Sequence, residues 1–405
     1  MAQRVWRSDD TDKWKHGFGK GSAGNGVISA NETQSIPNHT FTGTIATKAG
    51  VVDDTADLNV GDIVVIHQSR GTGAGHIEYN VIASIVNSTD LTFKYDLTLT
   101  YASQSQLIAP LQYKTLTVNS GVTVTAPAYS SGKGGFIVYW AKESIDINGA
   151  LNLKSKGYAG GAKSSWGNWA SQGEGTAGAG SAAQAANGNG GGGGKSGTGN
   201  AGSHPGGGGG GGGHANAGSN GANASYTGDG GGLLGYGGSA VGSATMIDVH
   251  FGGGGAGSGS AFSQCSGNYW ANGQDGSKGG GIVILIAPTI NINNATGSIN
   301  LGSDNTSNSD GNAGTSGSGA GGSGLFKGID VNLGTTRVTA SAGTTGTSPG
   351  RCSSTGGRGG QGSVGRLHVD YSGSISGTTT PTLDSRLDAT IIPVSKKGGL
   401  LYSLA

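Results

Sequence analysis

Residues 204–214 read HPGGGGGGGGH, so that eight consecutive glycines lie between two histidines. Shorter glycine runs occupy residues 190–194, 252–255 and 279–281. Such a run fits a flexible linker, because glycine loses more backbone entropy on ordering than any other residue. It also fits a lattice of extended threefold helices of the polyproline-II type. These helices have no internal hydrogen bonds, so their neighbours must satisfy their N–H and C=O groups.

The residues around the glycine runs favour the ordered lattice. Eight residues at about 3.1 Å each would span roughly 25 Å, a useful thickness for a packed slab. Without side chains, neighbouring backbones can approach closely enough for N–H···O and weak Cα–H···O contacts. Bulky residues also interrupt the glycine-rich sequence, which a pure linker would not need: Trp166, Trp169, Tyr226, Leu233, Leu234 and Tyr236. We therefore predict a polyglycine-II lattice.

The composition excludes several classes of protein. Of the 87 glycines in 405 residues, 16 lie in the first 150 residues and 71 in the remaining 255. They do not recur as Gly-X-Y and proline numbers only 8, which excludes collagen. A net charge of +1 provides no basic field for nucleic acid. The longest apolar run, residues 282–287, is too short to span a membrane, and MAQRVWRSDD at the start lacks the apolar stretch of a Sec signal.

The region before the glycine-rich part has the pattern of short β-strands. Residues 113–118 and 122–126 alternate apolar residues with threonine, the period of a half-buried strand. The sequence Asn119-Ser120-Gly121 between them predicts a hairpin turn. Further apolar runs at 62–66, 77–85 and 91–95 give a spacing typical of a small barrel or sandwich. No stretch has sustained helical periodicity, so we expect almost no α-helix.

An apolar strand unit recurs three times around the glycine-rich segments. The copies begin at Gly134, Gly280 and Gly362, and each is an apolar strand followed by a turn and a strand that ends in asparagine or glycine. One such unit cannot bury its own apolar face, so the copies must stack on one another.

The predicted fold class is therefore all-β, a small N-terminal barrel or sandwich followed by stacked strand repeats with a polyglycine-II lattice. The boundaries are an extended arm at residues 1–45, a β-rich attachment module at 46–130, the glycine-rich domain at 131–380 and a C-terminal segment at 381–405. Small apolar runs at 391–394 and 399–402 allow the C-terminal segment to contact another subunit, so a homo-oligomer is an open alternative.

Motifs for chemistry are missing or incomplete in the sequence. The run before Lys195-Ser196 has Asn189 where a phosphate-binding loop needs glycine. The sequence has no CxxC motif or His/Cys cluster, so we expect no metal and no cofactor. Cys265 and Cys352 allow either two thiols or one disulfide. A glycosidase needs paired carboxylates, but the acids of residues 157–281 are widely spaced: Glu174, Asp229, Asp248 and Asp275. We predict a protein that is not an enzyme.

Aromatic residues in glycine-, serine- and asparagine-rich sequence are the strongest functional candidates. Rigid rings give contact area and small polar neighbours give hydrogen bonds, as in a recognition surface. The candidate receptor-binding residues are Trp166, Trp169, His204, His214, Tyr226, Tyr236, Tyr269 and Trp270. The alternative is that these rings cover the ends of the lattice. A structural role predicts that the three tryptophans are buried, whereas receptor binding predicts that some are exposed at one tip.

The glycine-rich body, with its octaglycine run and aromatic-bearing segments, resembles the polyglycine-sandwich adhesins at the tail-fibre tips of T-even-type phages. That resemblance covers about residues 157–365 and implies packed polyglycine-II helices that display receptor-binding loops at one end. Residues 61–75 and 113–135 resemble a module found before glycine-rich regions in large bacterial surface proteins and in some phage proteins. Known adhesins of the phage type are smaller and lack this β-rich front and the strand repeat.

These resemblances predict a bacteriophage virion protein, a tail-fibre or tail-tip adhesin that binds without catalysis. Its partners would be other virion proteins, through the N-terminal region, and a host surface polysaccharide or outer-membrane protein. We expect no nucleic-acid binding and no membrane insertion, and a location on the virion surface after release by lysis. The alternatives are a structural virion component such as a head fibre or decoration protein, a bacterial extracellular adhesin or matrix protein, and a polysaccharide depolymerase.

Overall fold

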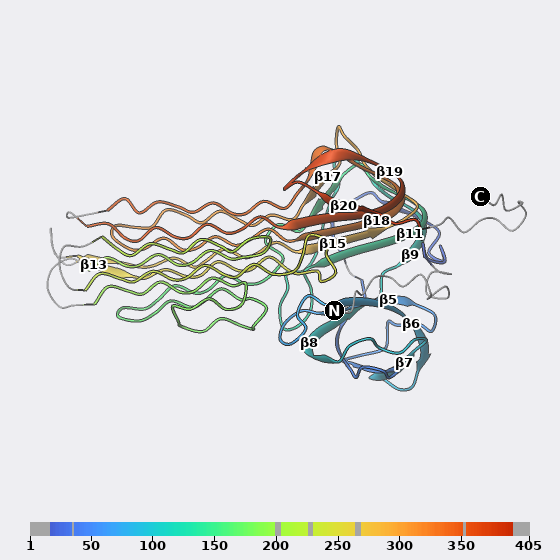
Figure 1. Ribbon diagram of the computed structural model, residues 1–405, viewed down its shortest axis with the longest axis horizontal. Coiled ribbons are helices and arrows are strands. Elements are labelled where there is room, and N and C mark those ends of the chain that lie inside the picture. Colours follow the sequence, from blue (N-terminus) through green and yellow to red (C-terminus); the bar gives the residue numbers. More distant parts are fainter. Residues whose placement is uncertain are drawn as a thin grey trace, which may run out of the picture.

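The computed structural model describes residues 17–34, 36–198, 204–225, 230–263, 269–350 and 354–391. These residues form a closed barrel, a large parallel sheet and a long glycine-rich stalk that projects from one end of the sheet (Figure 1). None of the described residues lies in an α-helix, so the all-β prediction is confirmed.

The barrel is antiparallel throughout and closes in the order β3-β4-β7-β6-β5-β8. Its strands are β3 (Asn38–Gly43), β4 (Ala49–Val52), β5 (Ile63–Gln68), β6 (Ile77–Ile85), β7 (Asp90–Phe93) and β8 (Tyr101–Ile108). Phe41 packs edge-on against Phe93 and Tyr101, with ring centroids 5.8 and 5.5 Å apart. The barrel therefore has its own apolar core, as the alternating pattern predicts.

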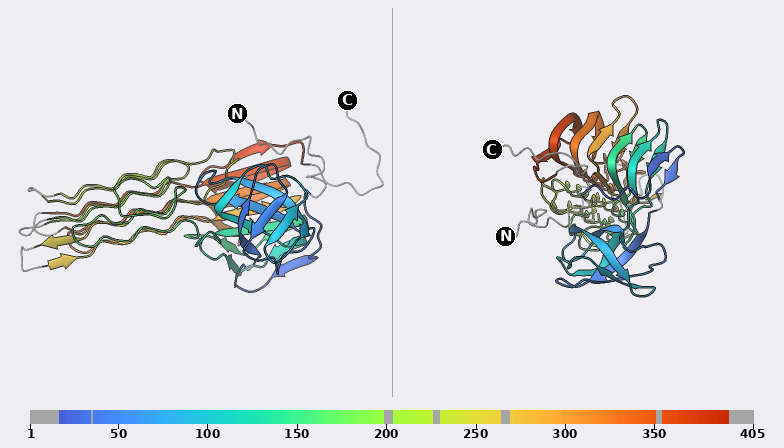
Figure 2. Two further views of the ribbon diagram at one scale, coloured as in Figure 1. Left: turned by 90° about the horizontal axis from the view of Figure 1, so that it is seen from below. Right: turned by 90° about the vertical axis from the view of Figure 1, so that its right-hand side faces the viewer.

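The large sheet is built from strands that all pair in parallel. They are β1 (Asn25–Ile28), β2 (Glu32–Thr33), β9 (Gln112–Val118), β10 (Thr123–Thr125), β11 (Phe136–Ile147), β12 (Ala150–Asn152), β15 (Ile282–Ile286), β16 (Thr289–Ile292), β17 (Ser298–Asn300), β18 (Ser323–Thr339), β19 (Arg366–Thr380) and β20 (Asp384–Leu387). We call each group of consecutive strands that forms one layer of this stack a rung. Successive rungs lie side by side in chain order, as the right-hand view of Figure 2 shows. The chain leaves the sheet into the stalk after β12, after β17 and after β18, and it returns each time to begin the next strand of the stack.

The predicted stacking of the strand repeat is confirmed. Phe136 of the first copy pairs with Ile282 of the second, and the register continues in step to Trp140 and Ile286. The second and third copies are not neighbours, however, because β18 lies between them and pairs with both. The sequence analysis missed β18, which also stacks in parallel and begins after a glycine pair.

The predicted hairpin at residues 119–121 is wrong in its pairing. A turn does occur, with Val122 N–H donating to the Asn119 carbonyl (3.2 Å) and a φ of 79° at Gly121. The strands on either side of it do not pair with each other. β9 pairs with β1 and β11, whereas β10 pairs with β2 and β12. The turn therefore joins two strands of the same rung, and we call such strands the arms of the rung.

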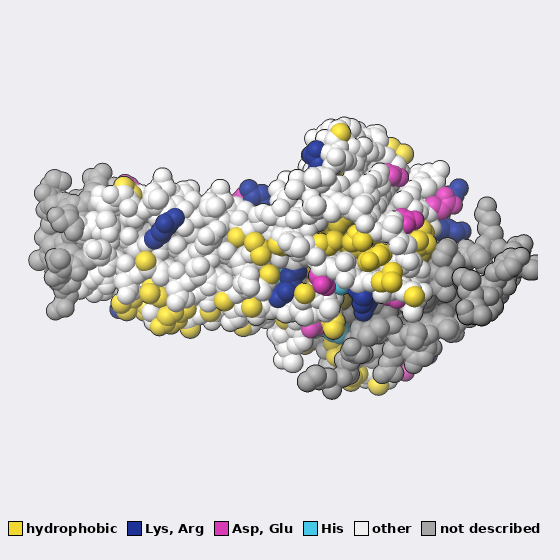
Figure 3. All heavy atoms as spheres, turned by 45° about the horizontal axis from the view of Figure 1, so that its top comes forward, with side chains coloured by type: hydrophobic (Ala, Val, Ile, Leu, Met, Phe, Trp, Pro, Cys, Tyr) yellow, Lys and Arg dark blue, Asp and Glu magenta, His cyan; other side chains and the backbone are white. Residues whose placement is uncertain are grey.

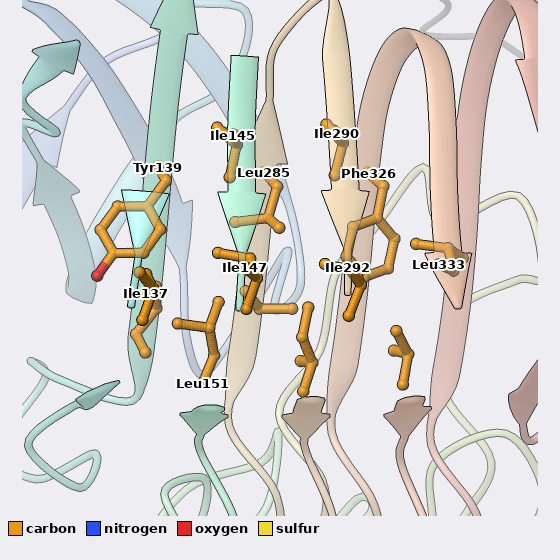
Figure 4. Close-up of a cluster of buried hydrophobic side chains, with 14 of the residues drawn as sticks. Ile137, Tyr139, Ile145, Ile147, Leu151, Leu285, Ile290, Ile292, Phe326 and Leu333 are labelled. Atoms are coloured by element: carbon orange, nitrogen blue, oxygen red, sulfur yellow. The ribbon is translucent and has the colours of Figure 1, made fainter. Parts of the chain in front are cut away.

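Alternation along β11 explains why the sheet is covered on both faces. Ile137 and Tyr139 point into the core between the arms of the rungs, where Leu285, Ile290 and Phe326 join them (Figure 4). Val138 and Trp140 point to the opposite face and pack with Val65 and Ile108 of the barrel. The barrel therefore covers the outer face of the sheet with apolar side chains.

The octaglycine run (residues 206–213) hydrogen-bonds with a period of three. The N–H groups of residues 206, 209 and 212 donate to segment 312–318, those of 207, 210 and 213 to segment 189–195, and those of 208 and 211 to segment 219–222. The carbonyls in the same order accept from segments 357–363, 253–259 and 235–238. Six neighbours thus surround one helix, which confirms the predicted polyglycine-II lattice.

Solvent exposure follows the same period in the outer rows of the stalk. Gly232, Gly235 and Gly238 are buried, whereas Leu233, Tyr236 and Ser239 are exposed. This spacing differs from the two-residue period of a strand and the 3.6-residue period of an α-helix. The helix at residues 231–239 therefore turns one residue in three toward solvent and can carry a side chain there, whereas the row at 216–223 exposes two residues in three.

Candidate functional site

The distal end of the stalk, the end farthest from the barrel, carries a short antiparallel pair. Strands β13 (Ala261–Ser263) and β14 (Tyr269–Ala271) form it, and Figure 1 labels β13 at this end. The His204 backbone joins β13, because its N–H donates to the Phe262 carbonyl (2.7 Å) and its carbonyl accepts from the Phe262 N–H (3.1 Å). The start of the octaglycine run is thereby fixed to the hairpin.

Four rings from three distant parts of the chain meet there, and we call them the distal aromatic cluster: Trp166, His204, Phe262 and Trp270. Phe262 and Trp270 are cross-strand partners with ring centroids 4.5 Å apart. Trp166 stands almost perpendicular to Trp270, with an interplanar angle of 84° and a centroid distance of 4.9 Å. Trp166 also packs edge-on against Phe262 and His204, at 5.9 and 6.3 Å.

Exposure divides the cluster into a base and a surface. Phe262 and His204 are 6% and 3% exposed, whereas Trp270 is 58% exposed and Trp166 is half-buried. A turn positions Trp166, in which Asn168 N–H donates to the Ser165 carbonyl (3.2 Å). The buried rings therefore hold two accessible indoles at the end of the stalk.

Buried serines fix the three segments beneath these rings. The Oγ atoms of Ser164 and Ser196 lie 2.5 Å apart, and the Ser260 N–H donates to both at 3.0 Å. The Ser260 hydroxyl donates in turn to the Ser164 carbonyl at 2.8 Å. Because these hydrogen bonds link backbone and side chains in a buried place, they hold the cluster in one arrangement.

Trp169 lies just below the cluster, on the side of the stalk. It is half-buried and its backbone bridges to Lys195, whose Nζ lies 5.8 Å from the centroid of the indole. The Lys195 N–H and carbonyl both take part in the lattice, with Leu233 and Gly207. Trp169 therefore has a cation–π contact with a residue of the lattice itself.

His214 and Tyr236 lie away from the cluster. His214 is fully buried at the sheet end of the octaglycine run, where its Nδ1–H donates to the Gly321 carbonyl (2.7 Å). Burial lowers the pKa of His214 to about 3, so the ring is neutral at pH 7. Tyr236 is 47% exposed on the flank of the stalk, level with Gly210.

The remaining candidates fall on residues that the structure does not fully describe. Tyr226, Cys265 and Cys352 lie outside the described residues. Tyr269 is described by its backbone, which pairs with Ser263 in the hairpin. Sequence analysis missed Phe262, which has no aromatic neighbour in sequence; the signal was that Ala-Phe-Ser and Tyr-Trp-Ala triplets flank a short polar segment.

Of the four acids of residues 157–281, Asp229 lies outside the described residues and the other three serve separate contacts. Glu174 accepts from Arg70 at 2.5 Å, Asp248 lies 3.6 Å from His76, and Asp275 accepts the Lys163 N–H at 2.8 Å. Burial raises the pKa of Glu174 above its usual value. Within the described ranges, no three His, Cys, Asp or Glu side chains gather as metal ligands. The same ranges contain no helix with the length and apolarity needed to cross a membrane.

Comparisons with known proteins find little. No family model matches the chain, and no curated protein matches it. Among solved structures, the chain has a weak likeness to the tailspike protein gp49 from Pseudomonas phage LKA1, with 12% identity and a TM-score of 0.17. The match covers 32% of this chain and 30% of the tailspike, so the chain spans less than a third of that protein. The chain has a weak structural likeness to a phage tail protein, one too weak to establish a common fold.

Proposed function

We propose that this protein is a phage tail-type virion protein whose stalk binds the host cell surface at its distal end, without catalysis. The observation that carries the proposal is the 58% exposure of Trp270 on a fixed aromatic base. A large apolar side chain at the end of an ordered lattice exposes apolar surface to water, and a bound partner would bury that surface with a gain in free energy.

The architecture supports a binding role. Backbone hydrogen bonds in every direction make the lattice a stiff spacer, and Figure 3 shows few charged side chains along the stalk. The distal aromatic cluster is small, so one copy would bind weakly. Several copies on one particle would bind strongly through avidity.

The opposite end of the molecule suits attachment to the particle. Arg70 and Gly71 of the barrel contact Glu174 and Thr176 at the base of the stalk, at 2.5 and 2.8 Å. The barrel therefore packs beside the sheet and leaves the distal end clear. In this proposal the N-terminal region binds other virion proteins, and the protein is located on the virion surface.

Binding to intact candidate host cells tests the proposal. Fluorescently labelled wild type should bind saturably, Trp270→Ala should bind at least tenfold more weakly, and Tyr236→Ala should bind like the wild type. Tyr236 is the matched control because it is an exposed aromatic residue on the flank of the same lattice. Absence of saturable binding to every host, together with stable incorporation into particles, would favour a structural virion component instead.

A further inference from the structure

We infer that the ligand of the distal aromatic cluster is a hexopyranose unit of a cell-surface polysaccharide, which stacks on Trp270. This inference rests on the proposed host-binding function and narrows its partner to one chemical class. It depends on the arrangement of the two indoles, the support beneath them and the polar groups beside them.

The two indoles form a corner rather than a flat patch. The Trp166 and Trp270 planes meet at 84° with centroids 4.9 Å apart, and Trp270 is the more exposed ring. A pyranose ring is a rigid disc with C–H groups on its faces and hydroxyls around its rim. The electron-rich face of an indole attracts such C–H groups, while the second indole limits the position of the disc from the side.

Phe262 and His204 fill the space beneath the two indoles, so the ligand can reach only the solvent-facing side of the cluster. Phe262 packs 4.5 Å from Trp270 and is 6% exposed, and His204 beside it is 3% exposed. A protein loop that inserts an apolar side chain needs a hole beneath the surface to bury it. This surface offers exposed indole area on Trp270 instead, which suits a ligand that stacks.

Neutral hydrogen-bonding groups flank the corner. Asn168 and Asn272 are exposed amides, each two residues from one of the two indoles. Asn168 is fixed in place, because its Nδ2 donates to Ser165 Oγ at 3.0 Å. Amides both donate and accept, so they match sugar hydroxyls, which also do both.

Selective removal of surface components from cells that bind the protein tests this inference. One portion of cells is oxidised with periodate, which cleaves the vicinal diols of sugars, and a second is digested with proteinase K. Polysaccharide released from the same cells by mild acid is added as a soluble competitor. Binding is measured for wild type, Trp270→Ala, Trp270→Phe and Tyr236→Ala, after circular dichroism confirms that each is folded.

A saccharide ligand predicts that periodate removes at least nine-tenths of the binding, that proteinase K spares it and that the released polysaccharide competes. Trp270→Ala should lose tenfold or more in affinity, whereas Trp270→Phe should retain part of it because a ring face persists. Loss after proteinase K but not after periodate would overturn the saccharide inference and leave host binding intact. Absence of binding to any untreated cell would overturn both.

Discussion

Gly210 of the octaglycine run packs directly on the backbone of Tyr236, so closely that a β-carbon on Gly210 would lie 2.0 Å from the Tyr236 carbonyl oxygen. The neighbouring Gly235 N–H donates to the Gly208 carbonyl at 2.8 Å, which fixes that spacing. Glycine at this position is therefore required by close approach of two backbones.

Substitution of Gly210 by alanine should destabilise the stalk by at least about 3 kcal/mol, because neither backbone can move without breaking lattice hydrogen bonds. Chemical unfolding followed by circular dichroism would measure the loss. Ser239→Ala is the matched control, since Ser239 faces solvent in the same lattice and should change stability by less than about 0.5 kcal/mol. Equal effects of the two substitutions would contradict the lattice packing.

Glu174→Gln should weaken the joint between barrel and stalk. The Arg70 and Glu174 side chains are 13% and 11% exposed, and removal of one partner leaves a buried charge. We expect a loss of roughly 3 kcal/mol and faster hydrogen exchange in the segments on both sides of the joint. The exposed pair of Lys114 and Glu143, 3.9 Å apart, supplies the control. Glu143→Gln should have almost no effect on the free energy of unfolding. A similar loss there would show that the buried Arg70–Glu174 pair contributes no more to stability than an exposed pair.

Acid should destabilise the junction at the base of the stalk. Burial lowers the pKa of His67 and His214 to about 3 and that of His250 to about 4, from 6.5. The folded state thus favours the neutral rings, so their stabilisation is complete above pH 6.5 and declines as the pH falls toward the folded-state pKa, about 4 for His250 and about 3 for His67 and His214. Each ring contributes about 1.4 kcal/mol per pH unit in that window.

A substitution at His214 isolates one of these contributions. His214→Gln keeps a side-chain donor near the Gly321 carbonyl but removes the titrating ring. Free energies of unfolding measured between pH 7 and 4.5 should decline less steeply for the variant, by about one proton. An unchanged slope would show that His214 does not titrate on unfolding.

Phe262 and Trp270 should separate stability from binding. Phe262 is buried, so Phe262→Ala should cost about 3 kcal/mol or open the hairpin locally, with loss of binding. Trp270→Ala should leave the thermal midpoint within about 2 °C of the wild type, since the side chain is 58% exposed, while binding falls. Differential scanning fluorimetry beside the cell-binding assay distinguishes them. A large drop in the Trp270→Ala midpoint would indicate a structural role for that indole.

The sequence predicts the fold well where the chain repeats a local signal. Residues 206–213 can form one ordered structure, the polyglycine-II helix, when every backbone N–H group has a partner in a neighbouring segment. The similar apolar strands at 136–140 and 282–286 indicate directly that the copies stack. Residues 119–121 could not show that β9 and β10 each pair in parallel with other strands, because a tight turn suits both a hairpin and a connection within one layer of the stack. Two of the partners that decide it, β1 and β2, are remote in sequence and lie before the whole barrel.

The candidate site was predictable only in part. The pattern of isolated rings in small polar sequence identifies Trp166, His204 and Trp270. It also selects His214 and Tyr236, which lie away from the distal aromatic cluster. Which rings meet depends on how far along the lattice each one lies. That position is set by hydrogen bonds between segments far apart in sequence, such as the bond from Gly357 N–H to the Gly206 carbonyl. Phe262 was missed because its importance comes from the strand opposite it.

The threefold period of the stalk also constrains how such a chain can change length. Removal of one residue from the run at 206–213 would rotate everything after it by about 120° about the helix axis and point each remaining group at the wrong neighbour. Removal of three would restore the match and shorten that helix by about 9 Å, and the same removal from each neighbouring helix would shorten the whole spacer. Variants of this protein that keep their lattice should therefore differ in reach by whole turns.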